Sequence, residues 1–119
     1  MPANHTVIIW HNPRCSKSRG TLDLLQERGI APVVVDYQKN PPDAEEIEQA
    51  LKLLGREPRG LMRQGEAVYA KLGLDDPKLT RKQLVDAMAD HPILIERPLV
   101  FANGKAAIGR PPEAVLTIL

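Results

Sequence analysis

Residues 7–37 read VIIWHNPRCSKSRGTLDLLQERGIAPVVVDY, and this stretch decides the fold. The β-branched run Val7–Trp10 predicts a buried strand, and the leucine spacing that follows predicts a helix from about Ser16 to Arg28. Gly29 stands where a helix commonly ends, and Val33–Tyr37 predicts a second strand. Strand, helix and strand within about 30 residues form a βαβ unit, so we expect parallel strands with a right-handed crossover.

The middle of the chain, from about residue 41 to 92, is predicted to be a helical insert. Asp43–Leu54 has apolar residues at helical spacing, begins with a capping-box sequence and is followed by Gly55. A short helix is expected near Glu66–Leu72. A second capping-box sequence opens a helix from Thr80 to about Asp90, which a His-Pro dipeptide then ends.

The C-terminal part predicts a hairpin followed by a helix. Leu99–Phe101 and Ala106–Ile108 flank Asn103-Gly104, the dipeptide that most strongly signals a two-residue hairpin turn. Pro111-Pro112 then predicts the start of a final helix. We therefore expect one α/β domain, residues 1–119, in which βαβ and ββα halves form a mixed four-stranded sheet with the helical insert between them.

Composition excludes several kinds of partner. Sixteen Lys and Arg against 15 Asp and Glu give a net charge of only +1, so the chain lacks the excess of positive charge that is typical of nucleic-acid-binding proteins. Aromatic residues make up only 3%, so a base-stacking platform is not expected. No apolar run approaches the about 20 residues of a membrane span. Met1–His5 lacks the basic region and apolar stretch that begin a signal peptide, so we expect a cytoplasmic protein.

Cys15 is the single cysteine, so it cannot form an intramolecular disulfide, and with the three histidines it matches no metal-ligand spacing. It stands between a predicted strand and a predicted helix N-terminus, where free amides and the helix dipole lower the pKa of a thiol. Arg14, Lys17 and Arg19 add positive charge nearby. A lone cysteine is often a small buried hydrophobe, but these polar neighbours favour an accessible, reactive thiol.

Spacing excludes two other cysteine chemistries. A dithiol redox centre needs Cys-x-x-Cys, and Ser18 takes the place of the second thiol. A tyrosine-phosphatase loop needs Cys-x-x-x-x-x-Arg, and Thr21 takes the place of the arginine. The Ser18 hydroxyl lies one helical turn beyond Cys15 and is a candidate hydrogen-bond donor to the thiolate. His11 is a candidate base or electrostatic partner, although a loop histidine often only caps a turn.

The segment His11–Arg19, HNPRCSKSR, resembles the active-site loop of the glutaredoxin-coupled arsenate reductase family. The resemblance covers nearly the whole chain. Five further segments match the family: Asn40-Pro41-Pro42, Leu61-Met62-Arg63, His91-Pro92-Ile93-Leu94, Glu96-Arg97-Pro98 and Gly109-Arg110-Pro111-Pro112-Glu113. Each of them is a weak signal by itself, but their order and spacing along the chain are specific.

This resemblance implies a thioredoxin-like fold in which the monothiol Cys15 attacks arsenate. Glutathione is then a co-substrate that joins the adduct, and the partner protein glutaredoxin completes reduction to arsenite. No bound cofactor or metal is implied. Matched position by position, Arg63, Arg97 and Arg110 bind the oxyanion. Guanidinium groups suit this role because they bind such oxygens in bidentate fashion.

The resemblance also assigns residues around the thiol. His11 matches a histidine that influences the thiolate, and Pro98 matches the proline that is cis beside the active cysteine in thioredoxin-like folds. Asn12 belongs to the same loop and, with Pro98, is expected to shape the site structurally. Cys15, His11 and Ser18 are thus the candidate catalytic residues.

Two other functions stay open at this point. One is a thiol oxidoreductase of the same fold that acts on another substrate, such as a glutathione mixed disulfide. The other is a non-enzymatic transcription regulator similar to Spx, which binds RNA polymerase. Spx-type proteins commonly sense oxidation through Cys-x-x-Cys, which this chain lacks, and the three candidate arginines favour an anion site instead.

Overall fold

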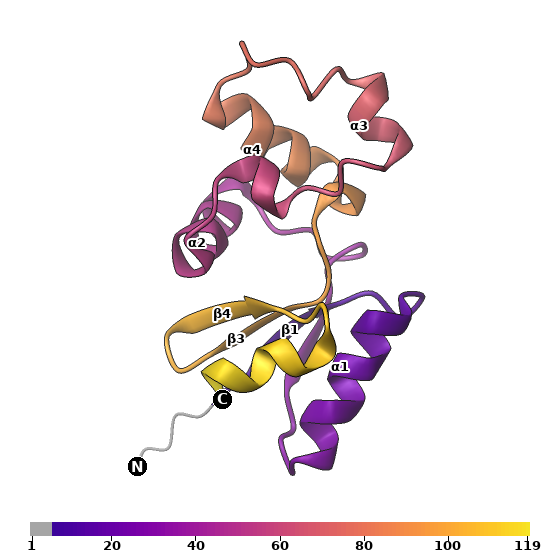
Figure 1. The fold of residues 1–119 in the computed structure, drawn as a ribbon, viewed down its shortest axis with the longest axis vertical. Coiled ribbons are helices and arrows are strands. Elements are labelled where there is room, and N and C mark those ends of the chain that lie inside the picture. The colour runs from indigo at the N-terminus through magenta and orange to yellow at the C-terminus, as the bar shows by residue number, and fades with distance from the viewer. Residues whose placement is uncertain (1–5) are drawn as a thin grey trace. The chain divides into compact units, whose positions relative to one another are not determined.

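The structure, a computed structural model, describes residues 6–119. Its strands, α-helices and 3-10 helices (η) follow in the order β1 (Ile8–His11), α1 (Ser16–Glu27), β2 (Val33–Asp36), α2 (Ala44–Leu54), η1 (Pro58–Leu61), α3 (Ala67–Lys71), α4 (Arg81–Asp90), η2 (Pro92–Leu94), β3 (Leu99–Ala102), β4 (Lys105–Ile108) and η3 (Pro112–Ile118) (Figure 1). Met1–His5, on which the expectation of no signal peptide rests, lies outside the described residues.

The chain divides into two compact units. The sheet unit consists of Met1–Asn40 and Arg97–Leu119, and the helical unit consists of Pro41–Glu96. The helical unit contains the predicted insert of about residues 41–92. That the whole chain acts as one domain stays a prediction.

A mixed four-stranded sheet forms the centre of the sheet unit. The strand order is β2-β1-β3-β4. β1 and β2 are parallel, whereas β1 pairs with β3, and β3 with β4, in antiparallel fashion. The parallel pair is the predicted βαβ unit and the antiparallel pair β3–β4 is the predicted hairpin. The prediction of an α/β fold with a mixed sheet is therefore confirmed.

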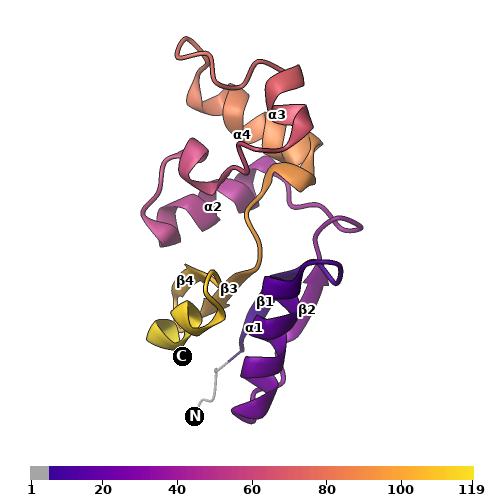
Figure 2. The same cartoon turned by 45° about the vertical axis from the view of Figure 1, so that its right-hand side comes forward.

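One face of the sheet is covered by α1 and η3, which contact each other (Figures 1 and 2). The core on this face joins side chains of the strands to one side chain of α1 and two of η3. Its buried members are Val7, Ile9, Leu25, Val100, Ala102, Val115 and Ile118. Burial of this apolar surface fixes α1 against β1, and so fixes the loop that joins them.

Local signals in the sheet unit act as their residue types predict. Gly29 has a φ of 76°, and its amide donates to the carbonyl of Gln26 at 3.0 Å, which closes α1. Asn103 and Gly104 have φ values of 55° and 72°, as a two-residue type I′ hairpin turn requires. These two turns set where α1 stops and how β3 and β4 pair.

The helical unit forms around the contact of α2 with α4. Both helices begin with a complete capping box, on Asp43 in α2 and Thr80 in α4, as predicted. Gly55 ends α2 in the left-handed conformation, with a φ of 65°. The short helix α3 begins after Glu66 and ends before Leu72, again as predicted.

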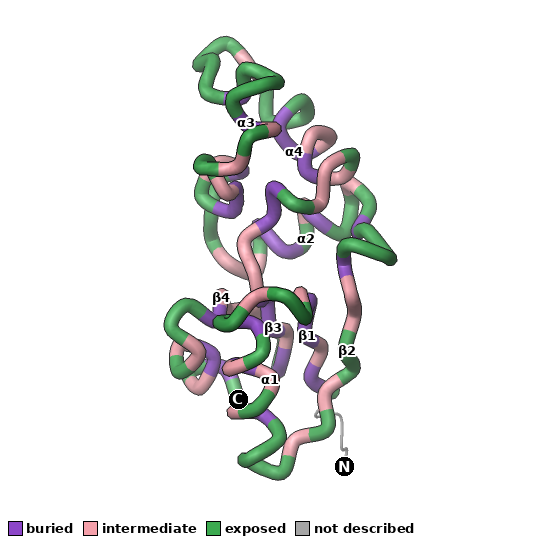
Figure 3. Tube along the Cα trace, turned by 90° about the vertical axis from the view of Figure 1, so that its right-hand side faces the viewer, coloured by how far each residue is buried: buried purple, intermediate pink, exposed green. Residues whose placement is uncertain are grey.

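Three details differ from the expectations. β1 extends to His11, and β2 ends at Asp36, so that Tyr37 lies beyond the strand. The final helix η3 is a 3-10 helix and not an α-helix, and the amide of Ala114 donates to the carbonyl of Pro111 three residues earlier, as this tighter geometry requires. β2 is an edge strand and is only partly buried (Figure 3).

Among the described residues no helix has the length and apolar character needed to cross a membrane.

Candidate active site

The loop between β1 and α1 presents Cys15 at the N-terminus of α1. The amide of Cys15 donates to the carbonyl of Asn12 at 3.0 Å, and the side-chain oxygen of Asn12 accepts from the amide of Arg14 at 2.9 Å. These bonds fold the loop into a tight turn. Cys15 is the N-cap residue of α1, with φ −98° and ψ 124°, and its own side chain makes no capping bond. The thiol therefore lies where free helix amides point outward.

The Cys15 thiol has a lowered pKa even though it is partly buried. Burial is the largest single influence and by itself raises the pKa of Cys15. The backbone N–H of Ser18, the guanidinium of Arg97 and the backbone N–H of Lys17 together lower that pKa by more, because each stabilises the thiolate. The site thus favours the nucleophilic form of the cysteine.

The Ser18 hydroxyl has partners other than the thiol. Ser18 is fully buried, and its Oγ lies 2.6 Å from Nδ1 of His11 and accepts from the amide of Asn12 at 2.9 Å. The hydroxyl of Ser18 thus ties His11 to the loop, whereas the backbone amide of Ser18 is the group that acts on Cys15. The expectation that this hydroxyl bonds the thiolate is replaced by that arrangement, since a buried hydroxyl takes the nearest available partners.

His11 is buried at the end of β1. Burial lowers the pKa of His11, the charge of Asp36 opposes this effect, and the charge of Arg19 adds to it. The imidazole is therefore neutral near pH 7. A neutral ring bonded to Ser18 suits a role in holding the loop, and a catalytic role for His11 stays a prediction.

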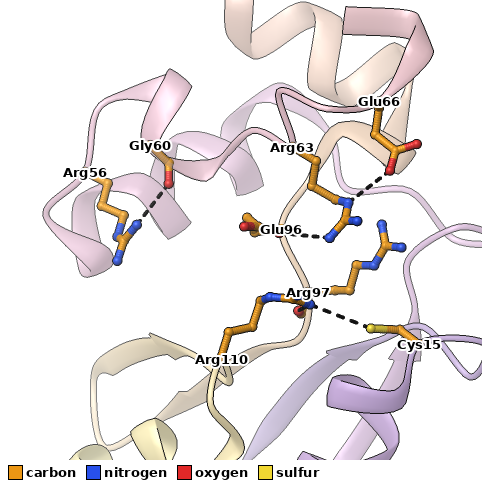
Figure 4. A network of polar contacts seen from close by, with 8 residues as sticks. All are labelled: Cys15, Arg56, Gly60, Arg63, Glu66, Glu96, Arg97 and Arg110. Carbon is orange, nitrogen blue, oxygen red and sulfur yellow. Dashed lines mark hydrogen bonds and ion pairs between the residues drawn. The ribbon is translucent and has the colours of Figure 1, made fainter.

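Arg110 lies beside the thiol. Its Nη1 is 3.8 Å from Sγ of Cys15 and 3.3 Å from the carbonyl oxygen of Arg97, to which it donates (Figure 4). The preceding residue, Gly109, is packed tightly: a Cβ added there would lie 2.4 Å from Oγ1 of Thr21. The Gly109 amide also donates to the carbonyl of Pro98 at 2.9 Å. Close packing on α1 thus sets the position from which Arg110 reaches the sulfur.

Arg97 contributes a guanidinium whose inner atoms are buried. Nε and Nη1 of Arg97 have no hydrogen-bond partner within residues 6–119. The positive charge of Arg97 lowers the pKa of the Cys15 thiol. The peptide bond between Arg97 and Pro98 is cis, as the family resemblance implied for Pro98. Arg97 therefore directly precedes the cis-proline Pro98, after which the chain enters strand β3.

Arg63 belongs to the helical unit, where two carboxylates hold it. Its Nε lies 3.1 Å from Glu66 and its Nη1 lies 3.1 Å from Glu96 (Figure 4). Burial lowers the pKa of Arg63, but the two carboxylates together raise it above the usual value. Its predicted convergence on Cys15 stays a prediction.

Two further arginines of the helical unit, Arg56 and Arg59, lie close to Arg63 in the chain. Arg56 donates to the carbonyl of Gly60 at 3.0 Å, and Arg59 donates to the carbonyls of Leu74 and Asp76. Both therefore serve to hold backbone segments together.

Within residues 6–119, no group of three His, Cys, Asp or Glu side chains is arranged to hold a metal ion. The structure thus brings together Cys15, His11, Ser18, Arg97 and Arg110 in the sheet unit. Two residues that sequence reasoning did not single out also lie near these groups: Thr21, which packs on Gly109, and the buried Tyr37, whose pKa burial raises and Arg97 and Asn12 both lower in part. For Tyr37 the available signal was an aromatic hydroxyl at the carboxyl end of a predicted parallel strand.

Comparison with known proteins identifies the family of this chain. The model of the ArsC family matches residues 10–118, which include both the cysteine loop and Arg110. This chain belongs to the ArsC family. The prediction of its relationship to arsenate reductases is thereby confirmed.

The relatives of this ArsC family chain include proteins with and without a stated activity. An arsenate reductase of Neisseria meningitidis is 54% identical over 112 residues, which cover 93% of this chain and 96% of the relative. YfgD of Escherichia coli, described as uncharacterized, is 55% identical over 114 residues, 95% of this chain and 96% of the relative. A solved structure of an arsenate reductase from Vibrio cholerae is 50% identical, with a TM-score of 0.96 over 98% of this chain and all of that one. The fold is therefore the thioredoxin-like fold of these reductases.

Proposed function

We propose that this chain reduces arsenate to arsenite through a covalent adduct on Cys15, with glutathione and glutaredoxin as reductants. One observation carries the proposal: the N-cap residue of α1 carries a thiol of lowered pKa that stands beside two guanidinium groups, those of Arg97 and Arg110. The relatives named arsenate reductase support arsenate as the anion, since each is half or more identical over most of its length.

The first step needs an anion held beside a thiolate. The Cys15 thiolate attacks the arsenic of arsenate, a sulfur–arsenic bond forms, and an arsenic–oxygen bond breaks as oxygen leaves with protons as water. Arg97 and Arg110 bind the arsenate oxygens and stabilise their charge as the bond forms. Arg63 is proposed as a third arginine for the same anion.

The second step needs electrons from outside the chain. Cys15 is the only cysteine, so it cannot form an internal disulfide that resolves its adduct. Glutathione forms a second sulfur–arsenic bond as another oxygen leaves as water. The glutaredoxin thiolate then attacks the glutathione sulfur, a mixed disulfide forms, and the electron pair of the broken sulfur–arsenic bond stays on arsenic. The two thiols thus supply the two electrons that convert arsenic(V) to arsenic(III). Water then adds to the arsenic, the bond to the Cys15 sulfur breaks, and arsenite leaves as the Cys15 thiol is regenerated. Because a thiol cycle of this kind needs a reducing compartment, we propose that the protein works in the cytoplasm.

A coupled assay tests this function. Arsenate reduction is measured with thioredoxin alone, with glutathione alone, and with glutathione plus glutaredoxin, with Cys15→Ser as the blank. We expect full activity only in the last mixture and none with Cys15→Ser, because a neutral hydroxyl is a poor nucleophile. Full activity with thioredoxin alone would contradict the monothiol scheme. Inactivity in every mixture, with a reactive Cys15, would favour another substrate such as a glutathione mixed disulfide.

A further inference from the structure

The net charge of +1 conceals a separation of charge between the two units. The sheet unit carries eight Lys and Arg against four Asp and Glu, whereas the helical unit carries eight Lys and Arg against 11 Asp and Glu. The positive excess therefore belongs to the unit that contains Cys15. An excess of one sign attracts ligands of the opposite sign, so this unit favours anionic partners.

The ion pairs follow the same division. Within residues 6–119 every ion pair joins two residues of the helical unit, and no Lys or Arg of the sheet unit pairs with a carboxylate. Five of the eight cations of the sheet unit belong to the site or to its loop, namely Arg14, Lys17, Arg19, Arg97 and Arg110. The reactive thiol thus stands among cations that the described protein does not neutralise by direct pairing.

The acidic residue that the strand register places beside the loop is occupied elsewhere. Asp36 lies opposite His11 in the pairing of β1 with β2. Its carboxylate accepts from the backbone amide of Gln38 at 3.1 Å and from that of Lys39 at 3.4 Å. Asp36 therefore serves the turn after β2 and forms no ion pair with the loop cations.

The loop cations differ in what their side chains do. Nη1 of Arg19 donates to the carbonyl of Pro13 at 3.1 Å, so Arg19 holds the loop itself. Arg14 and Lys17 are exposed, and within residues 6–119 their side chains donate to no protein group. Their backbones are nevertheless fixed, because the amide of Arg14 is bonded to the side chain of Asn12 and Lys17 lies in the first turn of α1. Two available cations thus project from a rigid backbone, one residue before Cys15 and two residues after it.

The oxyanion does not account for these two cations. Arsenate is compact, and the guanidinium groups of Arg97 and Arg110 suffice to bind its oxygens in bidentate fashion. The second substrate of the proposed function is larger, because glutathione is a tripeptide with a carboxylate toward each end and the thiol between them. When its sulfur reaches the adduct on Cys15, its carboxylates extend beyond the sulfur toward the residues that flank Cys15.

We propose that Arg14 and Lys17 bind the carboxylates of glutathione and so select an anionic thiol as the co-substrate at Cys15. This inference rests on the proposed function and deepens it, because it names the residues that recognise the second substrate. Arg14 and Lys17 take no part in bond making or breaking. They raise the occupancy of the thiol beside the adduct, and they disfavour thiols that are neutral or cationic.

The test uses a reaction of Cys15 that needs no arsenate. The Cys15 thiolate attacks one sulfur of a disulfide, a mixed disulfide forms, and the other half leaves as a thiolate. Its rate is measured with glutathione disulfide, which carries the carboxylates, and with hydroxyethyl disulfide, which is neutral. The ratio of the two rates cancels any change in the reactivity of the thiolate itself. The pH midpoint of iodoacetamide alkylation of Cys15 records that reactivity separately, and circular dichroism checks the fold.

The variants are Arg14→Gln, Lys17→Gln and the two combined, with Arg28→Gln as the matched control. Arg28 is an exposed arginine of the same unit, at the opposite end of α1 from Cys15. We expect each site variant to lower the rate ratio about 1.5- to fivefold, the range for one exposed ion pair, and the combined variant to lower it by about the product. Arg28→Gln should leave the ratio unchanged. Raising the salt concentration from about 0.05 to 0.5 M should lower the ratio of the original protein toward that of the combined variant.

Reversal of charge gives the sharper form of the test. Arg14→Glu combined with Lys17→Glu should make Cys15 react faster with cystamine, a cationic disulfide, than with glutathione disulfide. An unchanged ratio in the folded combined variant, or an equal fall in Arg28→Gln, would overturn the proposal. A fall in turnover with glutaredoxin at an unchanged ratio would also overturn it, because the cations would then serve the partner protein.

The same variants separate this inference from the proposed function. If the ratio falls as expected but no mixture reduces arsenate, the glutathione site stands and the arsenate reaction is refuted. If arsenate is reduced but the ratio does not change, the arsenate reaction stands and the glutathione site is refuted. In an active protein, the KM for glutathione should rise in the combined variant, whereas the KM for glutathione diethyl ester, whose carboxylates are blocked, should not rise. An equal rise for both thiols would overturn carboxylate recognition.

Discussion

The arginines of the helical unit and those beside Cys15 differ in what holds them. Arg63 pairs with two carboxylates, and Arg81 forms a bidentate pair with Glu48. Arg97, in the sheet unit, instead keeps two buried nitrogens without a partner within residues 6–119. Buried guanidinium nitrogens that no protein group satisfies are costly, so such nitrogens are retained where a ligand is their partner.

Arg110 also differs from the arginines of the helical unit, although its side chain is exposed. Its neighbours are the Cys15 sulfur and the carbonyl oxygen of Arg97, and no carboxylate pairs with it within residues 6–119. In the helical unit, by comparison, Arg59 holds two backbone carbonyls and so connects distant segments. The difference separates arginines that hold the fold from arginines that remain available to an anion.

The largest effect is expected at Arg97. Arg97→Lys keeps the charge but loses the planar fork, so the arsenate concentration that protects Cys15 from alkylation should rise about ten- to a hundredfold. The matched control is Arg59→Lys, which should lower the unfolding temperature and leave arsenate protection unchanged. Equal loss of protection in both variants would remove the distinction between the two kinds of arginine.

A second prediction concerns the packing that positions Arg110. In Gly109→Ala the new Cβ would meet Oγ1 of Thr21 at 2.4 Å and Cγ of Pro98 at 2.8 Å. The neighbours must move, so we expect a loss of about 1–3 kcal/mol in the free energy of unfolding and slower alkylation of Cys15.

The control for this packing is Gly65→Ala in the helical unit, where an added Cβ meets nothing within 4 Å. Both the free energy of unfolding and the alkylation rate should stay close to those of the original protein. If Gly109→Ala lost stability but alkylated at the original rate, Arg110 would not depend on this packing for its action on the thiol.

A smaller effect is expected in the pH dependence of Cys15, because burial opposes the groups that stabilise the thiolate. The alkylation midpoint should lie below the ordinary thiol value of 9.0. A depressed folded-state pKa also means that the thiolate contributes stability above the unfolded-state pKa, and that this contribution is lost as the pH falls through the folded-state pKa. Cys15→Ser should remove that part of the pH dependence of unfolding. A midpoint at 9.0 or above would refute an activated thiol.

The smallest effect on the site is expected from the helical unit. Asp43→Ala removes one half of the capping box of α2 and should cost about 1 kcal/mol in the free energy of unfolding. Neither the alkylation midpoint of Cys15 nor its protection by arsenate should change. A shift in either quantity, measured beside Asp43→Asn as the conservative variant, would show that the cap of α2 influences the thiol.

Features that depend on near neighbours in the chain were predictable. Both capping boxes, the glycine that ends α1 and the Asn-Gly hairpin turn are satisfied within a few residues of one another, so the residue types alone indicate them. The position of Cys15 at a helix N-terminus follows in the same way, since a strand and a helix with only a short loop between them leave the cysteine at the cap.

The partners of the site residues were decided by the tertiary structure. The Ser18 hydroxyl bonds to His11 and Asn12, and Arg110 reaches the sulfur from 95 residues away along the chain. The residue type determines which hydrogen bonds a side chain is able to make. Which of those bonds form depends on packing between distant segments, because a buried polar group takes the partners that the folded core leaves beside it. The sequence by itself therefore determined the elements and the reactive cysteine, and tertiary packing decided which side chains hold that cysteine and which arginines stay free for an anion.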